Sequence, residues 1–120
     1  MLFLTPGAIQ KILLGRKTVT RRPAVEGKPC RYQVGRIYAV QPGRGKPAVT
    51  RIRVVAVLKE PWVGFWALGF MDKEARREGF DTWTLFEEAY VAMNGKAALR
   101  GPCWRIKFEL VEEAPTGRQE

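Results

Sequence analysis

Two long stretches of alternating apolar and polar residues constrain this chain most strongly. Ala48–Leu58 and Cys103–Val111 place apolar side chains at every second position, which is the pattern of a β-strand with one buried face. The first stretch also carries valines on its second face, which favours a central, bent strand of a small barrel. Its inward positions are predicted to be Thr50, Ile52, Val54, Ala56 and Leu58. Those of the second stretch are Trp104, Ile106, Phe108 and Leu110.

Three short helices are predicted from the residues that mark their starts and stops. These boundary residues are Thr5-Pro6 and Gly15, then Asp72 and Gly79, then Asp81 or Thr82 and Asn94-Gly95. Between its boundaries the third helix carries a stripe of large apolar residues at helical spacing, which we expect to face the core. The stripe consists of Trp83, Phe86, Tyr90 and Met93.

Shorter strands are predicted at Leu2–Thr5, Lys17–Arg22 and Gly35–Val40. Strands before and after the helices favour an α+β fold, a small mixed β-barrel flanked by about three short helices. A chain of 120 residues suits one hydrophobic core. Residues 1–112 are therefore predicted to form a single domain, and residues 113–120 a polar C-terminal tail.

The composition excludes several classes of function. The chain contains no histidine and no serine, which excludes His-ligated metal sites and Ser-His-Asp or Cys-His catalysis. Cys30 and Cys103 lie far apart, so we expect two unpaired cysteines that pack as small hydrophobic residues. Neither a metal site nor a cofactor is predicted. No apolar run approaches the roughly 18 residues of a membrane helix and no signal peptide is recognised, so a cytoplasmic protein is the default expectation.

The positive charge is concentrated in the first half of the chain. Residues 1–59 contain 13 Lys and Arg and one acid, Glu26, whereas residues 60–120 contain 8 Lys and Arg and 11 acids. The two halves therefore carry net charges of +12 and −3, which add up to the +9 of the whole chain. A one-sided basic surface raises the local concentration of polyanions such as RNA. The alternative is a basic isoelectric point that serves only solubility.

Gly15–Arg22 is the densest cluster of functional side chains, with four cations and two hydroxyls in eight residues. We interpret it as the lining of a cleft for an anionic or nucleobase ligand, with too few acids nearby to cancel the charge. The candidate binding residues are Lys17, Thr18, Thr20, Arg21 and Arg22. In a regular strand Lys17 and Thr20 would point to opposite faces. Both can face one ligand if a bulge intervenes or, as we expect, if Lys17 lies in the turn before the strand.

Two other segments would add to the ligand-binding surface if their side chains contact the ligand. Gln41–Pro47 combines glycines with Arg44 and Lys46, which suits phosphate contact, although a plain basic hairpin turn has the same composition. Pro61–Phe70 is the most aromatic segment of the chain. Its rings would stack on bases if exposed, or would cover the core or a self-association patch if not.

Taken in order along the chain, these motifs resemble the ASCH family, named for homology to an activating signal cointegrator, within the PUA-like superfamily. The matching features are the helix ending in Gly15, the run of Gly15, Lys17, Thr20 and Arg22, the strand led by Gly35, Glu78-Gly79-Phe80, and Trp104-x-Ile-x-Phe. The resemblance covers most of the chain and implies a small β-barrel flanked by helices, with a cleft at the lysine run. It also implies RNA binding, which has been proposed for family members. The family's typical run has an acid where this chain has Thr20.

One subgroup, the small bacterial N4-acetylcytidine amidohydrolases, has a Lys-Thr-x-Thr-x-Arg run, as this chain has from Lys17 to Arg22. The resemblance implies that Lys17 activates Thr20 as nucleophile, provided that burial or nearby cations lower the lysine pKa. It also implies a glutamate on the later helix, and the best register places Leu85 at that position. The neighbouring acids that remain as substitutes are Glu78, Glu87 and Glu88.

Two hypotheses of function follow, and the oligomeric state is not predicted. In the first, the protein binds RNA or a nucleoside- or nucleotide-like ligand, with Lys17, Arg21 and Arg22 on phosphate or base edges. Arg44 and Lys46 would extend that surface. In the alternative, the protein hydrolyses N4-acylated cytidine, with Lys17 and Thr20 as catalytic base and nucleophile. An interaction domain, in which the motif only stabilises the barrel, is a third interpretation.

Overall fold

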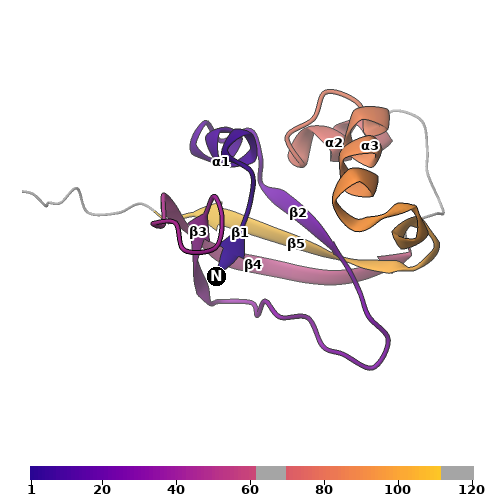
Figure 1. The fold of residues 1–120 in the computed structure, drawn as a ribbon, viewed down its shortest axis with the longest axis horizontal. Coiled ribbons are helices and arrows are strands. Elements are labelled where there is room, and N and C mark those ends of the chain that lie inside the picture. Colours follow the sequence, from indigo (N-terminus) through magenta and orange to yellow (C-terminus); the bar gives the residue numbers. More distant parts are fainter. Residues whose placement is uncertain (62–69, 112–120) are drawn as a thin grey trace, which may run out of the picture.

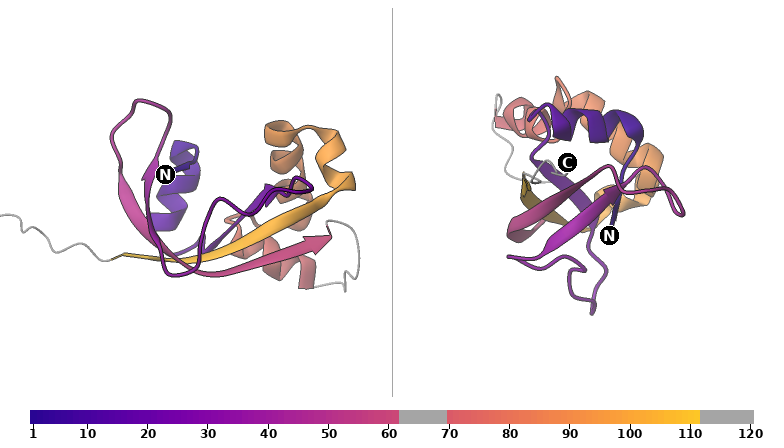
Figure 2. Two further views of the ribbon diagram at one scale, coloured as in Figure 1. Left: turned by 90° about the horizontal axis from the view of Figure 1, so that it is seen from below. Right: turned by 90° about the vertical axis from the view of Figure 1, so that its left-hand side faces the viewer.

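The computed structural model describes residues 1–61 and 70–111, which form a five-stranded mixed sheet with helices packed on it (Figure 1). The strands in spatial order are β1 (Leu2–Phe3), β3 (Ile37–Gln41), β4 (Thr50–Pro61), β5 (Pro102–Leu110) and β2 (Val19–Pro23). The first pair is parallel and the other pairs are antiparallel. The sheet curves into a half-barrel (Figure 2), so the predicted α+β class is confirmed. Most of the aromatic segment and the whole polar tail lie outside the described residues.

The helices all lie on one side of this sheet. They are α1 (Pro6–Leu13), α2 (Phe70–Arg77) and α3 (Trp83–Asn94), followed by a short 3-10 helix at Lys96–Arg100. Figures 1 and 2 show α1 over one end of the long β4–β5 ribbon and the α2–α3 pair over the other, with β2 running from α1 toward that pair. Within the described ranges, no helix has the length and apolar character needed to cross a membrane.

The helix boundaries follow the sequence signals, with one exception. The Thr5 hydroxyl accepts a hydrogen bond from the backbone amide three residues along, and Gly15 ends α1 with a φ of +75°. Thr82 caps α3 in the same way. The predicted role of Asp72 is wrong, because it lies inside α2 and its carboxylate accepts a hydrogen bond from the Trp83 amide at 2.9 Å. Asp72 therefore connects α2 to the start of α3.

Strand β4 contains a β-bulge between Val54 and Ala56, where its register against β5 shifts by one residue. The extra residue turns the rest of the strand over. Ala56 and Leu58 are consequently exposed, so their predicted inward positions are wrong, and Val57 packs against the core instead. Leu110, at the end of β5, is also exposed and also differs from the prediction. The positions buried as predicted before the bulge are Thr50, Ile52 and Val54.

Two apolar clusters hold the helices on the sheet. The larger joins α1 to the strands through Ile9 and Ile12, and the smaller joins α2 and α3 to β5 around Phe86 and Cys103. Both cysteines are free, as predicted, and burial raises the pKa of the Cys103 thiol to about 11. Because the clusters are anchored at opposite ends of the sheet, α1 and α3 face each other across β2.

Candidate functional site

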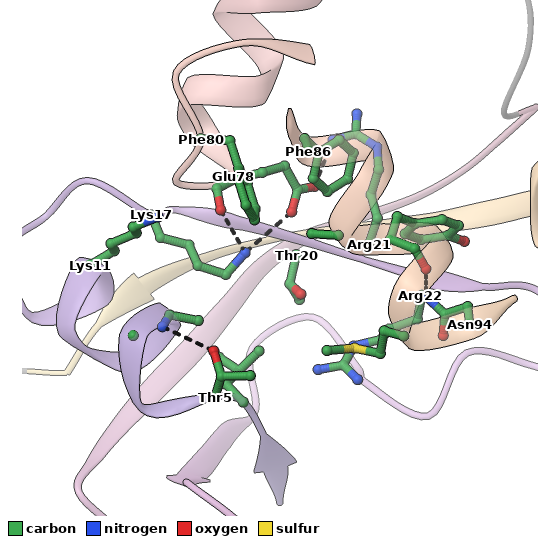
Figure 3. A pocket seen from close by; sticks show the side chains of 16 residues that line it. Thr5, Lys11, Lys17, Thr20, Arg21, Arg22, Glu78, Phe80, Phe86 and Asn94 are labelled. Atoms are coloured by element: carbon green, nitrogen blue, oxygen red, sulfur yellow. Dashed lines mark hydrogen bonds and ion pairs between the residues drawn. The ribbon is translucent and has the colours of Figure 1, made fainter. Parts of the chain in front are cut away.

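A pocket of about 240 Å³ lies between α1, β2 and the α2–α3 pair (Figure 3). Its polar lining comes from α1 and its cap, from residues before and within β2, from the end of α2 and from α3. These side chains include Lys17, Thr20, Arg22, Glu78 and Asn94. Aromatic rings form much of the remaining wall, and these belong to Phe80, Phe86 and Tyr90. The pocket therefore combines a few convergent polar groups with an apolar body, which is the usual character of a small-molecule site.

Lys17 reaches the pocket from the turn that joins α1 to β2. The strand begins only at Val19, so Lys17 precedes it and its side chain is not bound by the strand's alternation, as expected. Its Nζ donates hydrogen bonds to the Val19 carbonyl at 2.8 Å, the Glu78 carbonyl at 3.0 Å and Glu78 Oε1 at 3.2 Å. Three acceptors use all three ammonium hydrogens. Lys17 is only 5% exposed, and it lines the same pocket as Thr20 (Figure 3).

Burial lowers the pKa of Lys17 below its ordinary value, because a charged ammonium loses its hydration inside the protein. The Glu78 carboxylate opposes this effect, since it attracts and hydrogen-bonds the charged form. The positive charges of Arg22 and Lys11 add to the lowering. The result is a lysine that releases its proton more readily than a surface lysine does, which is the property required of a catalytic base.

The carboxylate that meets the lysine belongs to Glu78, the first residue after α2. Its second oxygen accepts a hydrogen bond from Arg21 at 2.7 Å, and the residue is 2% exposed. The family register had placed the glutamate at Leu85, but that side chain is 48% exposed on α3 and does not line this pocket. Glu87 and Glu88 do not line it either. The acid therefore comes from the turn before α3 and not from α3 itself.

Arg21 does not offer a free positive charge to a ligand. Its guanidinium contacts Glu78 at 2.7 Å, Glu74 at 2.8 Å and Glu60 at 3.2 Å, and its side chain is 2% exposed. The expectation of too few acids near the basic run is therefore wrong. The acidic second half of the chain supplies three carboxylates from α2, the end of α2 and β4, and they neutralise this cation.

The other candidate residues divide into those at the pocket and those away from it. Arg22 lines the pocket, and one of its terminal nitrogens donates a hydrogen bond to the Phe3 carbonyl at 3.1 Å. Thr18 does not line it; its backbone amide is instead bonded to the end of α2. Arg44 and Lys46 are exposed in the turn between β3 and β4 and also lie outside the pocket lining.

Sequence reasoning missed the contribution of the helices to this pocket. Phe86 and Tyr90 were predicted as core, and they are buried, but they also form one wall of the pocket. Met93 was predicted as core as well, and this prediction is wrong, because the residue is 58% exposed at the end of α3. Lys11 and Asn94 line it as well. Lys11 lies three and four residues after two other lining residues of α1, so helical spacing identifies it once the position of the pocket is known.

The turn after Glu78 depends on Gly79, which has a φ of +95°. A Cβ atom added there would lie 3.0 Å from the Lys11 Cδ atom and 3.5 Å from the Lys17 Cβ atom. We expect Gly79→Ala to lower the free energy of unfolding by about 1–2 kcal/mol from backbone strain, plus a crowding cost. Gly27→Ala is the matched control, because Gly27 has a φ of +80° with nothing within 4 Å. Equal losses in urea unfolding would mean that Gly79 is not crowded.

Glu74 is shared by the guanidinium groups of Arg21, Arg105 and Arg77. Burial alone would raise the pKa of its carboxyl, but the hydrogen bonds from these arginines outweigh burial and lower it to about 2. Because the Glu74 pKa is lower in the folded protein than its value of 4.5 in the unfolded chain, the ionised carboxylate stabilises the fold at pH values above 4.5. This stabilisation is lost as the pH falls from 4.5 to about 2. We expect a loss of up to about 3 kcal/mol over this range, measured by urea unfolding. Glu74→Gln should remove this part of the acid dependence, whereas Glu109→Gln, at an exposed ion pair, should retain it.

Solved structures with the same fold support the architecture described above. This chain superposes over 86% of its length on 69% of an ASCH domain from Lactobacillus crispatus JV V101, with a TM-score of 0.64 and 17% identity. The superposition on protein EF3133 from Enterococcus faecalis V583 includes 92% of this chain and 74% of that protein, with a TM-score of 0.68 and 18% identity. The superposition on the hypothetical protein PH0355 includes 92% of this chain and 96% of that protein, with a TM-score of 0.64 and 14% identity.

No protein-family model matches the sequence, and no curated protein matches it. At 14–18% identity the structural likeness establishes the fold alone. The chain therefore has an ASCH-like fold, and in architecture the resemblance drawn from its motifs is confirmed.

Proposed function

We propose that this protein is a small amidohydrolase that removes the acyl group from N4-acylated cytidine, with Lys17 as base and Thr20 as nucleophile. The observation that carries the proposal is the buried contact between the Lys17 ammonium and the Glu78 carboxylate, in a pocket that Thr20 also lines. Lysine, threonine and glutamate are the residue types that the amidohydrolase resemblance implies. Glu78 supplies the acid from a different position than the family register indicated.

The reaction begins with the neutral amine of Lys17, whose pKa burial lowers. The amine takes the proton from the Thr20 hydroxyl, and the threonine oxygen bonds to the acyl carbon of the substrate. The bond between that carbon and N4 then breaks, and the Lys17 ammonium returns the proton to the departing N4. In the second half, Lys17 takes a proton from a water molecule, whose oxygen bonds to the acyl carbon of the threonine ester. The bond from that carbon to the Thr20 oxygen breaks, and the Lys17 ammonium returns the proton to Thr20. The products are cytidine and the carboxylic acid.

Glu78 has a positioning role in this scheme. Of the three hydrogen bonds made by Lys17 Nζ, the longest is the one to Glu78 Oε1 at 3.2 Å. This bond is the one that a neutral amine, which has only two hydrogens, gives up when its lone pair turns toward Thr20. Glu78 keeps its place during this step because Arg21 holds its other oxygen at 2.7 Å.

The size and walls of the pocket support a single base with a small acyl group. A volume of about 240 Å³ lies slightly below the roughly 300–1,000 Å³ of typical ligand sites. The rings of Phe80, Phe86 and Tyr90 offer apolar surface for a planar heterocycle. A long polymer does not fit inside, so only one base at a time would enter.

Binding of RNA or a nucleotide without catalysis is the second candidate function. Arg22 in the pocket and the exposed cations of the first half of the chain favour it. The neutralisation of Arg21 by three carboxylates disfavours it. A salt series with short single-stranded RNA tests this candidate, because phosphate contacts release counterions. An affinity that does not change with salt would count against it.

The decisive test of the hydrolase is incubation of the purified protein with N4-acetylcytidine. We expect equimolar cytidine and acetate, measured by chromatography over time. N4-methylcytidine is the matched control substrate, because it carries a substituent on the same nitrogen but has no acyl carbon to attack. The proposal fails if N4-acetylcytidine yields no cytidine above the uncatalysed rate.

A further inference from the structure

A second cavity lies directly beside the pocket of Lys17 and shares Arg22 and Asn94 with it. Its volume is about 330 Å³. Arg22, Lys28 and Arg31 supply three cations to its wall, and none of the described residues that line it is acidic. This composition contrasts with the first pocket, where Glu78 stands against Lys17 and Arg21.

We propose that this second cavity binds a phosphate group of the substrate while the base occupies the first pocket. The phosphate subsite is defined by Arg22, Lys28 and Arg31. The inference rests on the proposed function and names the substrate class, a phosphorylated nucleoside in place of a free one. The two cavities meet at Arg22 and Asn94, so the sugar that joins base and phosphate would cross at these residues.

Among the cations of the basic run that line the first pocket, Arg22 is the one that remains available for this role. Arg21 is occupied by three carboxylates, and Lys17 by Glu78 and two carbonyls. Arg22 has a neutral partner instead, the Phe3 carbonyl, which accepts a hydrogen bond from one of its terminal nitrogens at 3.1 Å. Its buried Nε has no hydrogen-bond partner among the described residues. A guanidinium fixed in this way keeps its charge for an anion, and its planar donors suit phosphate.

Lys28 and Arg31 complete the subsite from the loop after β2. Both are exposed, so they reach an anion without being buried first. Tyr32 and Trp104 also line the cavity, and the Tyr32 hydroxyl already donates a hydrogen bond to the Met1 carbonyl at 3.2 Å. The polar side chains of this cavity that can still bind a ligand are therefore mainly cationic, so the cavity favours an anionic group.

The same phosphate chemistry can come from a mononucleotide or from a strand of RNA. A third cavity of about 460 Å³ flanks the first pocket through Lys11 and Phe80, and it carries Arg16 and Arg76 together with Asp81. A strand would have a second phosphate to place there, whereas a mononucleotide would not. Variants in this third cavity therefore distinguish the two sources.

The experiment compares kcat/KM for N4-acetylcytidine, its 5′-monophosphate and a trinucleotide with N4-acetylcytidine at its centre. We expect the phosphorylated substrates to be preferred by about tenfold over the nucleoside, equivalent to one well-placed ionic contact. The double variant Lys28→Gln/Arg31→Gln should abolish this preference. Arg36→Gln is the matched control, because Arg36 is an exposed cation that lines none of the three cavities.

The outcomes separate this inference from the proposed function. Equal kcat/KM for nucleotide and nucleoside, or a preference that survives in the double variant, overturns the subsite. A loss confined to the trinucleotide in Arg16→Gln/Arg76→Gln identifies a strand as the phosphate source, and no loss identifies a mononucleotide.

If none of the substrates is hydrolysed, the proposed function fails, and calorimetric binding of cytidine and cytidine 5′-monophosphate then decides the subsite. Tighter nucleotide binding that the double variant loses supports it, and equal binding overturns it.

Discussion

Replacing Lys17 by methionine is expected to lower kcat/KM for N4-acetylcytidine by about 10²–10⁴-fold, the usual contribution of a positioned general base. Methionine keeps much of the length and apolar volume of the lysine side chain but cannot take a proton. The loss should appear mainly in kcat, because the amine acts on the Thr20 hydroxyl and the departing nitrogen. The measurement is the initial rate of cytidine release at several substrate concentrations.

Two controls separate this effect from a folding defect. Lys46→Met removes an exposed cation outside the pocket, and its rate should equal that of the wild type. The melting curve of Lys17→Met should stay cooperative, since Glu78 retains its 2.7 Å contact with Arg21. Unchanged kcat in a folded Lys17→Met protein would remove the lysine from the reaction.

Replacing Arg21 by methionine is expected to lower the free energy of unfolding by about 3–5 kcal/mol, the range for breaking a buried ion pair from one side. The substitution leaves Glu74 and Glu78, each 2% exposed, without the cation that lies between them. Compensation is only partial, because Glu78 keeps Lys17 as its one cationic contact among the described residues and Glu74 keeps Arg105 and Arg77, both of them more exposed than Arg21. Urea unfolding near neutral pH measures the loss.

The matched control for this prediction is Arg53→Met. Arg53 contacts Glu109 at 3.2 Å, but their side chains are 43% and 56% exposed. An ion pair in water is stabilising by only about 0–1 kcal/mol, so this variant should unfold almost like the wild type. If Arg21→Met and Arg53→Met lost similar free energies of unfolding, burial would not be the reason that the Arg21 contacts stabilise the fold.

The local features of this protein were predictable from its sequence. Thr5 and Gly15 define α1 because caps act within a few residues. The position of Lys17 before β2 followed from the geometry of a strand, since no regular strand turns Lys17 and Thr20 to one side. Alternation gave most of the buried positions of β4 and β5. It failed after Val54, because a bulge has no marker in the apolar pattern.

The acidic partners of the site were not predictable in the same way. Lys17 and Glu78 are 61 residues apart, and Arg21 and Glu74 are 53 apart. Counting acids near the basic run in sequence therefore gave a cationic cleft, whereas the packing of α2 against β2 neutralises Arg21. The family register placed Leu85 at the glutamate position and left Glu78 only as one of three substitutes. Helix α3 presents Leu85 to solvent, and the turn before it presents Glu78 to the pocket.

The most direct measurement compares the hydrolysis of N4-acetylcytidine by Thr20→Ser and Thr20→Val. Thr20 is 4% exposed and lines the pocket. Valine has nearly the shape and volume of threonine, and serine lacks only its methyl group. Serine retains the hydroxyl that attacks the acyl carbon, and valine removes it. We expect Thr20→Ser to release cytidine at a measurable fraction of the wild-type rate and Thr20→Val to fall to the uncatalysed rate. Equal rates in the two variants would contradict the assignment of Thr20 as the nucleophile beside Lys17.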